Sequence, residues 1–308
     1  MVAPQFTIVG LGESLFDIFP ERRVLGGAPL NVAVHAHQLA GPCGGCGLVV
    51  SRVGQDELGQ TVFAELQQRG MSVDYLQTDP DRDTGRVYVA VDAQGQPDFE
   101  IVQGTAWDWL QFDPDLEDLA RRCEAVCFGS LAQRNSQARN TIYRFLDALN
   151  QRMVRMFDVN LRQDYFDQKV LQRSFEFANV AKLNDQELPI VADLLGVTSS
   201  SGDTDSSIQR MIRTFDLNLL VLTRGEAGTV IYAALDKYEG EPISYEPAQG
   251  ADAVGAGDAC AAAILIGLVR QWPMDHVVEV ANHTGAFVAS QPGATPQLPE
   301  SILAMVKQ

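Results

Sequence analysis

The sequence has no long hydrophobic run. Its longest apolar stretch, residues 259–269, is shorter than the roughly 18 residues that a membrane-spanning helix needs. The first five residues contain no basic residue, and the apolar run that follows them ends at Leu11. A secretory signal has a basic segment before a longer apolar one. We therefore expect neither a membrane helix nor a signal peptide, and a location in the cytoplasm.

Basic residues are scarce. The 308 residues include 23 lysines and arginines against 40 acidic residues, which gives a net charge of −17. Such a surface repels nucleic-acid phosphates and anionic membranes, so neither is an expected partner. A local electropositive pocket can still bind a small anionic molecule such as a nucleotide. We expect small-molecule partners and a chain that acts as a monomer or a homodimer.

Cysteines are few and lack the regular spacing of a disulfide framework. Their number, five, is odd, which favours a reducing compartment. Cys43 and Cys46 form a single C-x-x-C pair, whereas a zinc site would need a second pair or nearby histidines. His35 and His37 are two residues apart, so on one helix they would point in nearly opposite directions. The sequence therefore does not favour a zinc site.

Two common phosphate-binding patterns are missing. Gly10 and Gly12 follow an apolar strand, but the dinucleotide-binding pattern needs a third glycine where Leu15 stands. The phosphate loop G-x-x-x-x-G-K-[ST] does not occur in the sequence. These absences exclude a dehydrogenase of the dinucleotide-binding type and a P-loop enzyme.

Short apolar strands alternate with helical segments along most of the chain. This alternation predicts an α/β fold with a mostly parallel sheet that helices cover on both faces. The expected strands are residues 6–12, 48–54, 125–129, 155–159, 180–183 and 219–223. The expected helices are residues 31–39, 57–69, 116–122, 136–151, 168–177, 187–195 and 206–215.

A different pattern occurs between residues 85 and 102. Two β-prone runs, residues 85–92 and 99–102, flank a segment with Gly95 and Pro97 as turn residues, which predicts a β-hairpin. No helix separates the two runs, so we expect a small β-appendage on the main sheet. The length allows one large α/β domain or two domains, and because no strong linker is visible we expect the whole chain, residues 1–308, to form a single domain.

Near the C-terminus, a glycine-rich turn leads into an apolar helix. The turn contains Gly255, Ala256 and Gly257 and ends at Asp258. Glycine lets the backbone approach a ligand closely, and the free amides of a first helical turn attract anions. A fixed carboxylate beside an anion site suits transfer of a phosphoryl group to a hydroxyl. Taken alone, however, the segment is more typical of a helix cap, because Asp is a favoured N-cap residue.

Polar residues after strands are further candidates, because ligands bind at the carboxyl ends of parallel strands. Asp17 follows an apolar strand and could accept hydrogen bonds from two sugar hydroxyls. Asn31 ends a second glycine-rich segment, and its amide both donates and accepts. Each residue could instead be a turn or cap residue. Other polar residues and a glycine follow expected strands in the same way: Asn160, Arg162, Asn184, Glu187, Thr223 and Gly225.

Together, these segments resemble the ribokinase-like, or PfkB-type, carbohydrate kinase family over nearly the whole chain, and bacterial fructokinases above all. Seven segments carry the similarity in order: GESLFD at 12–17, GGAPLN at 26–31, VGQDELG at 53–59, DVNLR at 158–162, NDQE at 184–187, TRGEAG at 223–228 and GAGD at 255–258. The resemblance implies a three-layer α/β/α sandwich with a mostly parallel central sheet. It also implies a small β-sheet lid, formed by about residues 13–25 and 84–106.

The resemblance further implies an ATP-dependent phosphotransferase with an alcohol group as acceptor. The expected reaction transfers the γ-phosphoryl group of ATP to D-fructose and gives fructose 6-phosphate. Asp258 would be the base, and we expect the helix dipole to lower its pKa. The amides of Gly255, Ala256 and Gly257 would bind the γ-phosphate. The residues implied to hold the sugar are Asp17, Gly27, Asn31 and Arg162.

The implied nucleotide site lies at other segments. Asn184 and Glu187 would help to place Mg²⁺ and the phosphates, Glu187 through water. The residues implied for the ATP cleft are Thr223, Gly225 and Gly228, with Asn282 where the adenine pocket closes. Asp252, with the loop at 292–294, resembles the family's site for a monovalent cation such as K⁺.

Some positions depart from the family pattern and leave alternatives open. Ala253 replaces a usual Thr, Val159 a common Pro, and Gln297 a small polar residue, so the dependence on potassium stays open. Arg162 would face a carboxylate if the substrate were a sugar acid such as 2-keto-3-deoxygluconate, since a guanidinium binds a carboxylate through two hydrogen bonds. Other PfkB-type sugar or nucleoside substrates are further alternatives. A non-catalytic sugar- or nucleotide-binding protein on the same fold is an interpretation of another class.

Overall fold

The central sheet spans the molecule. The computed structural model describes residues 4–91, 97–199 and 202–307. Seven of the strands described there run parallel: β1 (Thr7–Leu11), β4 (Cys46–Gly54), β5 (Leu76–Asp79), β8 (Ala125–Phe128), β9 (Val154–Asp158), β10 (Val180–Asn184) and β11 (Leu219–Thr223). At one edge, β12 (Thr229–Tyr232) and β13 (Lys237–Glu239) continue the sheet in antiparallel fashion. The order is β13-β12-β11-β10-β9-β8-β1-β4-β5.

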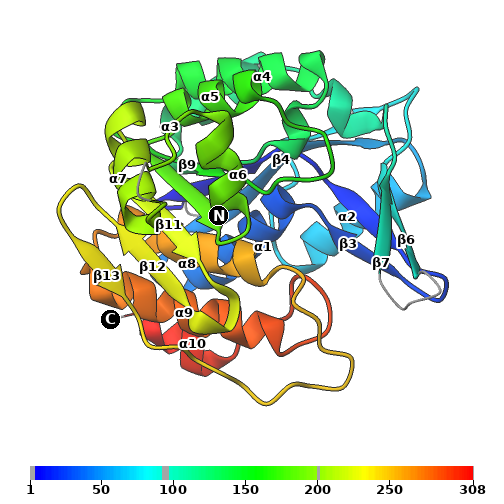
Figure 1. Ribbon diagram of the computed structural model, residues 1–308. Helices are drawn as coiled ribbons and strands as arrows, with labels where there is room; N and C mark the ends of the chain where they lie inside the picture. Colours follow the sequence, from blue (N-terminus) through cyan, green and yellow to red (C-terminus); the bar gives the residue numbers. More distant parts are fainter. Residues whose placement is uncertain (1–3, 92–96, 200–201, 308) are drawn as a thin grey trace.

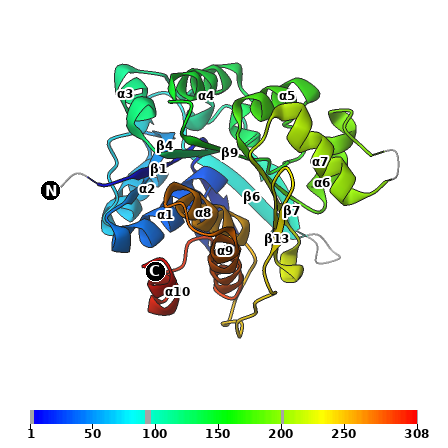
Figure 2. The same cartoon turned by 90° about the vertical axis from the view of Figure 1, so that its left-hand side faces the viewer.

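Helices cover both faces of this sheet, as Figures 1 and 2 show. On one face lie α3 (Pro114–Arg122), α4 (Ser136–Ala148), α5 (Gln168–Phe177), α6 (Glu187–Leu194) and α7 (Thr204–Phe215). On the other lie α1 (Ala28–Ala40), α2 (Glu57–Gln68), α8 (Ala256–Val269), α9 (Met274–Ala289) and α10 (Glu300–Met305). The predicted three-layer α/β/α fold is confirmed. In the described part of the chain, no helix is both long enough and apolar enough to cross a lipid bilayer.

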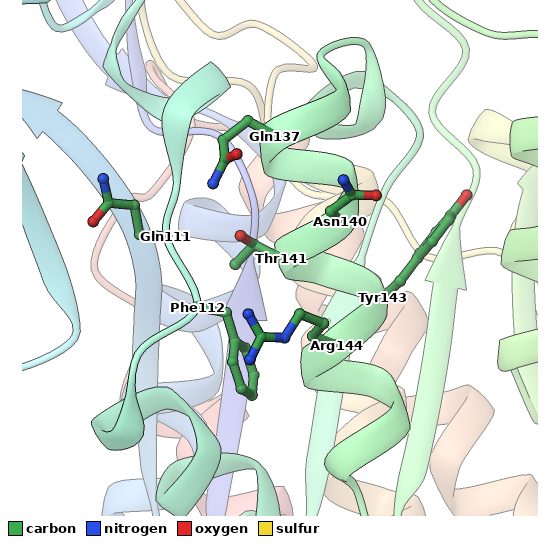
Figure 3. Close-up of a pocket in the computed structure, with 7 residues that line it drawn as sticks. All are labelled: Gln111, Phe112, Gln137, Asn140, Thr141, Tyr143 and Arg144. Carbon is green, nitrogen blue, oxygen red and sulfur yellow. The ribbon is translucent and has the colours of Figure 1, made fainter.

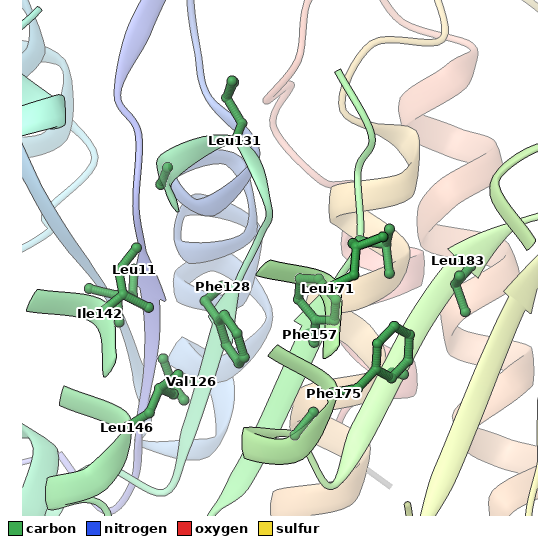
Figure 4. Close-up of a cluster of buried hydrophobic side chains, with 14 of the residues drawn as sticks. Leu11, Val126, Phe128, Leu131, Ile142, Leu146, Phe157, Leu171, Phe175 and Leu183 are labelled. Carbon is green, nitrogen blue, oxygen red and sulfur yellow. The ribbon is translucent and has the colours of Figure 1, made fainter. Parts of the chain in front are cut away.

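Side chains of successive strand residues pack on opposite faces of the sheet, as strand geometry requires. Phe128 of β8 and Phe157 of β9 stack at 5.3 Å in the cluster beneath α4 and α5, where Phe175 meets Phe157 edge-on (Figure 4). On the other face, α8 is buried over almost its whole length, from Asp258 to Gly267. A helix that is apolar on all sides is held in the core. The position of its first turn is therefore fixed by packing.

A second, smaller sheet lies to one side of the central sheet (Figure 1). Its described strands are β2 (Leu15–Ile18), β3 (Arg23–Gly26), β6 (Gly85–Val91) and β7 (Pro97–Ile101), in the order β3-β2-β6-β7. The antiparallel pairing of β6 with β7 confirms the predicted hairpin, although Pro97 begins β7 rather than lying in the turn. The predicted turn residue Gly95 lies outside the described residues. The hairpin is not an appendage of the main sheet, because β6 pairs in parallel with β2 in this separate sheet.

Candidate active site

Asp258 lies at the third position of α8, not at its cap. The N-cap is Gly255, and no side chain caps the helix. Asp258 is 9% exposed, and its Oδ2 accepts a 2.8 Å hydrogen bond from Asn31 Nδ2. Asn31 is itself not a cap, because it lies in the first turn of α1, whose N-cap is Gly27. The alternative interpretation of both residues as helix caps is therefore wrong.

The turn before α8 has a shape that only glycine allows. Gly255 has a φ of 80°, and a Cβ placed there would lie 2.1 Å from the carbonyl oxygen of Ala294. The amide of Ala256 donates to the Ala253 carbonyl at 3.3 Å. Within the described residues, the amides of Gly255 and Gly257 have no main-chain acceptor. Two of the three amides predicted for the anion site are therefore available to a ligand.

Burial, together with the charge of the nearby Asp158 carboxylate, raises the pKa of Asp258 to about 6. The hydrogen bond from Asn31 and the charges of Lys182 and Arg162 act in the opposite direction. The expectation that the helix dipole lowers this pKa is wrong, because removal of the carboxylate from water outweighs the dipole. Asp258 is consequently a stronger base than an exposed aspartate.

Asp17 and Arg162 lie on the side of the smaller sheet. Asp17 belongs to β2 and is half-buried; burial raises its pKa to about 6, and the charge of Arg162 opposes this shift. Arg162 also acts on the pKa of Asp258, so its charge influences both carboxyl groups. Arg162 lies in the connection between β9 and α5 and not at a helix entry, because α5 begins only at Gln168. Gly27, with a φ of 109°, borders this region.

Glu13 is a candidate that the sequence analysis missed. Its side chain is buried, and its Oε2 has no hydrogen-bond partner among the described residues. Burial raises the pKa of Glu13 to about 7; the charge of Arg162 opposes this shift, and the charge of Asp258 adds to it. Its carbonyl oxygen lies 2.5 Å from where a Cβ on Gly27 would be, which places Glu13 beside the start of α1. An acidic residue directly after a buried strand was the available signal.

Asn184 and Glu187 connect the ends of two strands. Asn184 Oδ1 accepts hydrogen bonds from the amides of Gln186 and Glu187, at 2.9 and 2.8 Å, at the start of α6. Each carboxylate oxygen of Glu187 accepts one main-chain amide, from Leu161 and from Asn184, both at 2.9 Å. A carboxylate oxygen can accept more than one hydrogen bond, so Glu187 retains capacity for a metal-bound water. No cluster of three metal-ligating side chains is present among the described residues.

The residues predicted for the ATP cleft gather around the turn between β11 and β12. Thr223 ends β11, while Gly225 and Gly228 have positive φ values of 56° and 79°. Asn282 Oδ1 accepts from the Thr229 amide at 3.0 Å, and its Nδ2 donates to the Glu241 carbonyl at 3.1 Å. Asn282 therefore ties α9 to the segments on either side of the β12–β13 edge.

Asp252 lies in the loop before the glycine turn and is already close to a cation. Its Oδ1 accepts from the Val254 amide at 3.2 Å, and its Oδ2 from the Gly293 amide at 3.4 Å. Arg22, in the connection between β2 and β3, places Nη2 3.6 Å from Asp252 Oδ2. The proximity of Asp252 to the loop at 292–294 is as expected, but an arginine shares this carboxylate.

A surface pocket elsewhere in the molecule is not the candidate site. It has a volume of about 560 Å³ and lies between α4 and the segment before α3 (Figure 3). None of the predicted site residues lines it, and no carboxylate does. Arg144, its charged lining residue, lies over the ring of Phe112 at 4.3 Å. The pocket therefore offers no group that could act as a base.

The segments that carry this site also carry a family relationship. The pattern of the pfkB family carbohydrate kinase matches residues 20–301. The chain belongs to this family. It is 30% identical over 307 residues to a fructokinase of Salmonella typhimurium, covering 94% of this chain and 95% of that one. It is 31% identical over 310 residues to a fructokinase of Klebsiella pneumoniae, with the same two coverages. The prediction of a carbohydrate kinase, a phosphotransferase that acts on a sugar hydroxyl, is confirmed.

Solved structures of kinases share the fold of this pfkB family member. A fructokinase of Xylella fastidiosa with bound ATP superimposes with a TM-score of 0.81 at 22% identity, covering 97% of this chain and 98% of the other. A fructokinase of Vibrio cholerae with fructose, ADP and calcium bound gives 0.79 at 24% identity, with coverages of 99% and 100%. An aminoimidazole riboside kinase of Salmonella enterica gives 0.78 at 22% identity, with coverages of 98% and 100%. At these identities the similarity establishes the ribokinase-like fold.

Proposed function

We propose that this pfkB family member transfers the γ-phosphoryl group of ATP to the 6-hydroxyl of D-fructose. The observation that carries the proposal is the placement of Asp258. Its buried carboxylate is held by Asn31 beside the free amides of Gly255 and Gly257. A base and an anion site in one turn are the two elements that phosphoryl transfer to a hydroxyl needs.

In the proposed reaction, the sugar hydroxyl oxygen attacks the γ-phosphorus as the bond from that phosphorus to the bridging oxygen of ADP breaks. Asp258 takes the hydroxyl proton, and ADP leaves with the bonding electron pair. The amides of Gly255 and Gly257 stabilise the charge on the migrating group, together with the dipole of α8. Asn31 keeps Asp258 in one orientation, so the base needs little rearrangement before it accepts the proton.

Fructose is the sugar that the relatives favour. The relatives at 30% and 31% identity that match nearly the whole chain are fructokinases. Asp17, Asn31 and Glu13 present carboxyl and amide groups, which suit the hydroxyls of a neutral sugar. Arg162 favours a second candidate, 2-keto-3-deoxygluconate, whose carboxylate a guanidinium would bind. The test is ADP release with fructose, ribose, tagatose, 2-keto-3-deoxygluconate and adenosine, and a preference for fructose is expected.

We propose that Mg²⁺ enters the site with ATP, mainly on the nucleotide phosphates. This fits a chain whose described residues form no three-ligand metal cluster, because Mg²⁺ is often held by phosphates, waters and one or two carboxylates. Glu187 would orient one metal-bound water, and Asn184 would support Glu187. The bound ion would neutralise part of the phosphate charge. The nucleotide cleft would be lined by Thr223, Gly225 and Gly228. Asn282 would lie where the adenine pocket closes.

We also propose that the smaller sheet, together with the segments that flank its strands, is a lid over the sugar in a single-domain chain. The contact between Arg22, in the connection between β2 and β3, and Asp252 of the loop before α8 supports the proposal. The cysteines, all free in the structure, support the expected cytoplasmic location. Monomer and homodimer both stay open as predictions.

Replacement of Asp17 by Ala is expected to raise the KM for the sugar by about tenfold or more, with a smaller change in kcat. The reason is that a contact made equally in the ground state and the transition state contributes to binding alone. Steady-state kinetics with fructose at saturating ATP measures the effect. Asp74→Ala, an exposed aspartate between α2 and β5, is the control and should leave the KM unchanged. An unaltered sugar KM in the Asp17 variant would contradict the assignment.

Asp252 is the proposed ligand of a monovalent cation, and Arg22 is expected to weaken the need for one. A guanidinium beside the carboxylate supplies positive charge that K⁺ would otherwise bring. In Arg22→Ala, potassium should stimulate kcat more strongly than in the wild type, when each is compared with the same ionic strength of a large organic cation. Equal stimulation of both proteins would show that Arg22 and K⁺ do not compete.

A further inference from the structure

A buried ion pair lies beneath the turn that precedes α8. Lys182 of β10 and Asp158 of β9 are neighbours in the strand register, and Lys182 Nζ lies 2.9 and 3.0 Å from the two carboxylate oxygens of Asp158. The two side chains are 5% and 3% exposed. Taking two charges out of water is costly, and an apolar pair of similar volume is often as stable or more so. The fold alone does not explain this pair.

The surroundings of the pair are apolar. The same face of the sheet carries Met156, Val180 and Val221, which pack with α8 in one hydrophobic cluster. Within the described part of the chain, the side chains of Lys182 and Asp158 make no hydrogen bond outside the pair. The two charges therefore interact with each other and with whatever lies above them at the carboxyl ends of the strands.

A second buried ion pair, between Arg52 and Asp79, differs from the first in its further hydrogen bonds. Arg52 Nε and Asp79 Oδ2 are 3.0 Å apart, and Asp79 also accepts the amides of Asp81 and Arg82. Arg52 donates in addition to the carbonyl of Trp109. This pair fixes loops through its further hydrogen bonds, whereas Lys182 and Asp158 fix none.

What lies above the pair is the glycine turn. A Cβ on Gly257 would be 3.4 Å from Lys182 Nζ, so the ammonium group lies against the main chain of the turn. The charges of Lys182 and Asp158 also reach Asp258, on which they act in opposite directions. The pair is thus placed next to both elements of the proposed chemistry, the anion site and the base.

We propose that Lys182 and Asp158 are positioning residues for the phosphoryl transfer, with Lys182 as a fixed positive charge beneath the anion site and Asp158 as the group that holds it there. The inference rests on the proposed function. The site already contains the carboxyl groups of Glu13, Asp17 and Asp258, and the γ-phosphate adds further negative charge. A preorganised buried cation stabilises that charge without rearrangement during the reaction. Lys182 need not touch the phosphate to do so.

The proposal also predicts how the base responds to each member of the pair. Lys182 lowers the pKa of Asp258, and Asp158 raises it. The other groups that face Asp258 come from each element packed around it: Asn31 on α1, Glu13 after β1, Cys127 on β8, Arg162 after β9 and Cys260 on α8. Burial raises the pKa of both thiols, so they stay neutral. The principal charged influences on Asp17 are instead Arg162 and Asp252.

The test is the pH dependence of kcat for Lys182→Met, Asp158→Asn and the double variant. The acidic limb of the profile is the pH range in which kcat falls as Asp258 becomes protonated. In Lys182→Met, this limb should move to higher pH by on the order of one unit, because a cation near the base is lost. In Asp158→Asn it should move to lower pH by a similar amount. Because the two shifts are opposed, they identify Asp258 as the titrating group and separate this role from a general loss of structure.

The double variant keeps the test decisive if a single variant fails to fold, since each single variant leaves one buried charge unpaired. It should fold, keep the acidic limb near its wild-type position and lose about tenfold or more in kcat, less than the loss of a directly bonded donor. Asp79→Asn, which breaks the pair with Arg52, is the control and should lower stability without moving the limb.

Two different failures can be told apart. A wild-type enzyme that phosphorylates a sugar, together with a double variant of wild-type kcat, would overturn the inference alone. The same holds if both single variants fold and their acidic limbs stay in place or move in one direction. A wild-type protein that releases no ADP with any sugar of the panel would overturn the proposed function and the inference with it.

Discussion

Asp258→Asn is expected to lower kcat by about 10²–10⁴-fold, the range for loss of a general base. Asn matches Asp in shape, but its amide cannot take the proton of the sugar hydroxyl. The protein should still fold, because Asp258 makes one side-chain hydrogen bond, to Asn31, which an amide oxygen can also accept. Steady-state ADP release and a thermal unfolding curve together measure the two effects.

Stability gives this prediction an internal control. Folding raises the pKa of Asp258 to about 6. As the pH rises from the pKa of this group in the unfolded chain to its pKa in the folded chain, ionisation of the carboxylate increasingly opposes folding. At pH 8 the Asn variant should therefore unfold at the same temperature as the wild type or a higher one. Asp115→Asn, an exposed acid in the first turn of α3, should leave kcat unchanged. Near-normal turnover in Asp258→Asn would refute the base assignment.

The same raised pKa sets the pH dependence of the wild type. Asp258 accepts a proton only when it is ionised, so kcat should fall as the pH drops through about 6. An exposed aspartate would place this limb near 4.

Gly255→Ala is expected to lower kcat by about 10²–10³-fold, the effect of losing one donor from an anion site. A Cβ at this position would lie 2.1 Å from the Ala294 carbonyl oxygen, and the φ of 80° is unfavourable for alanine. The turn must therefore shift, which moves the free amide of Gly255 away from the γ-phosphate. The KM for ATP and kcat, measured at saturating fructose, report the change.

Gly250→Ala is the matched control for this variant. Gly250 lies in the same loop with a φ of 79°, but a Cβ there would meet no atom within 4 Å. It carries the same backbone strain without the collision. Activity lost equally in both variants would mean that strain in the loop, rather than the position of the Gly255 amide, limits catalysis.

The sequence was sufficient to predict the architecture because local patterns specify it. Apolar runs bounded by turn residues marked the buried parallel strands, and the expected bounds differ from those in the structure by two residues at most. The edge strands β5, β12 and β13 were not expected, since short strands at a sheet edge carry a weak apolar pattern. The pairing of β2 with β6 joins segments some seventy residues apart in the chain, so the local pattern gave no sign of it, and only the family resemblance implied that residues 13–25 and 84–106 form one sheet.

The candidate site could be predicted residue by residue but not as an arrangement. Asp258 and Asn31 were both named, yet the bond between them joins positions 227 apart and depends on how α1 packs on α8. Lys182 was missed even though a lysine inside an apolar strand is unusual, because its partner lies on a different strand. The direction of the Asp258 pKa shift also needed the structure, since the degree of burial decides whether the helix dipole dominates.

The three acidic side chains that gather at this site have a consequence for the resting enzyme. Burial raises the pKa values of Glu13, Asp17 and Asp258 to about 7, 6 and 6, so each of these groups takes up a proton closer to neutrality than an exposed carboxyl group does. A sugar whose hydroxyls donate to these groups favours their ionised forms. Sugar binding would then release protons to the solvent before phosphoryl transfer begins, so the affinity for sugar depends on the surrounding pH.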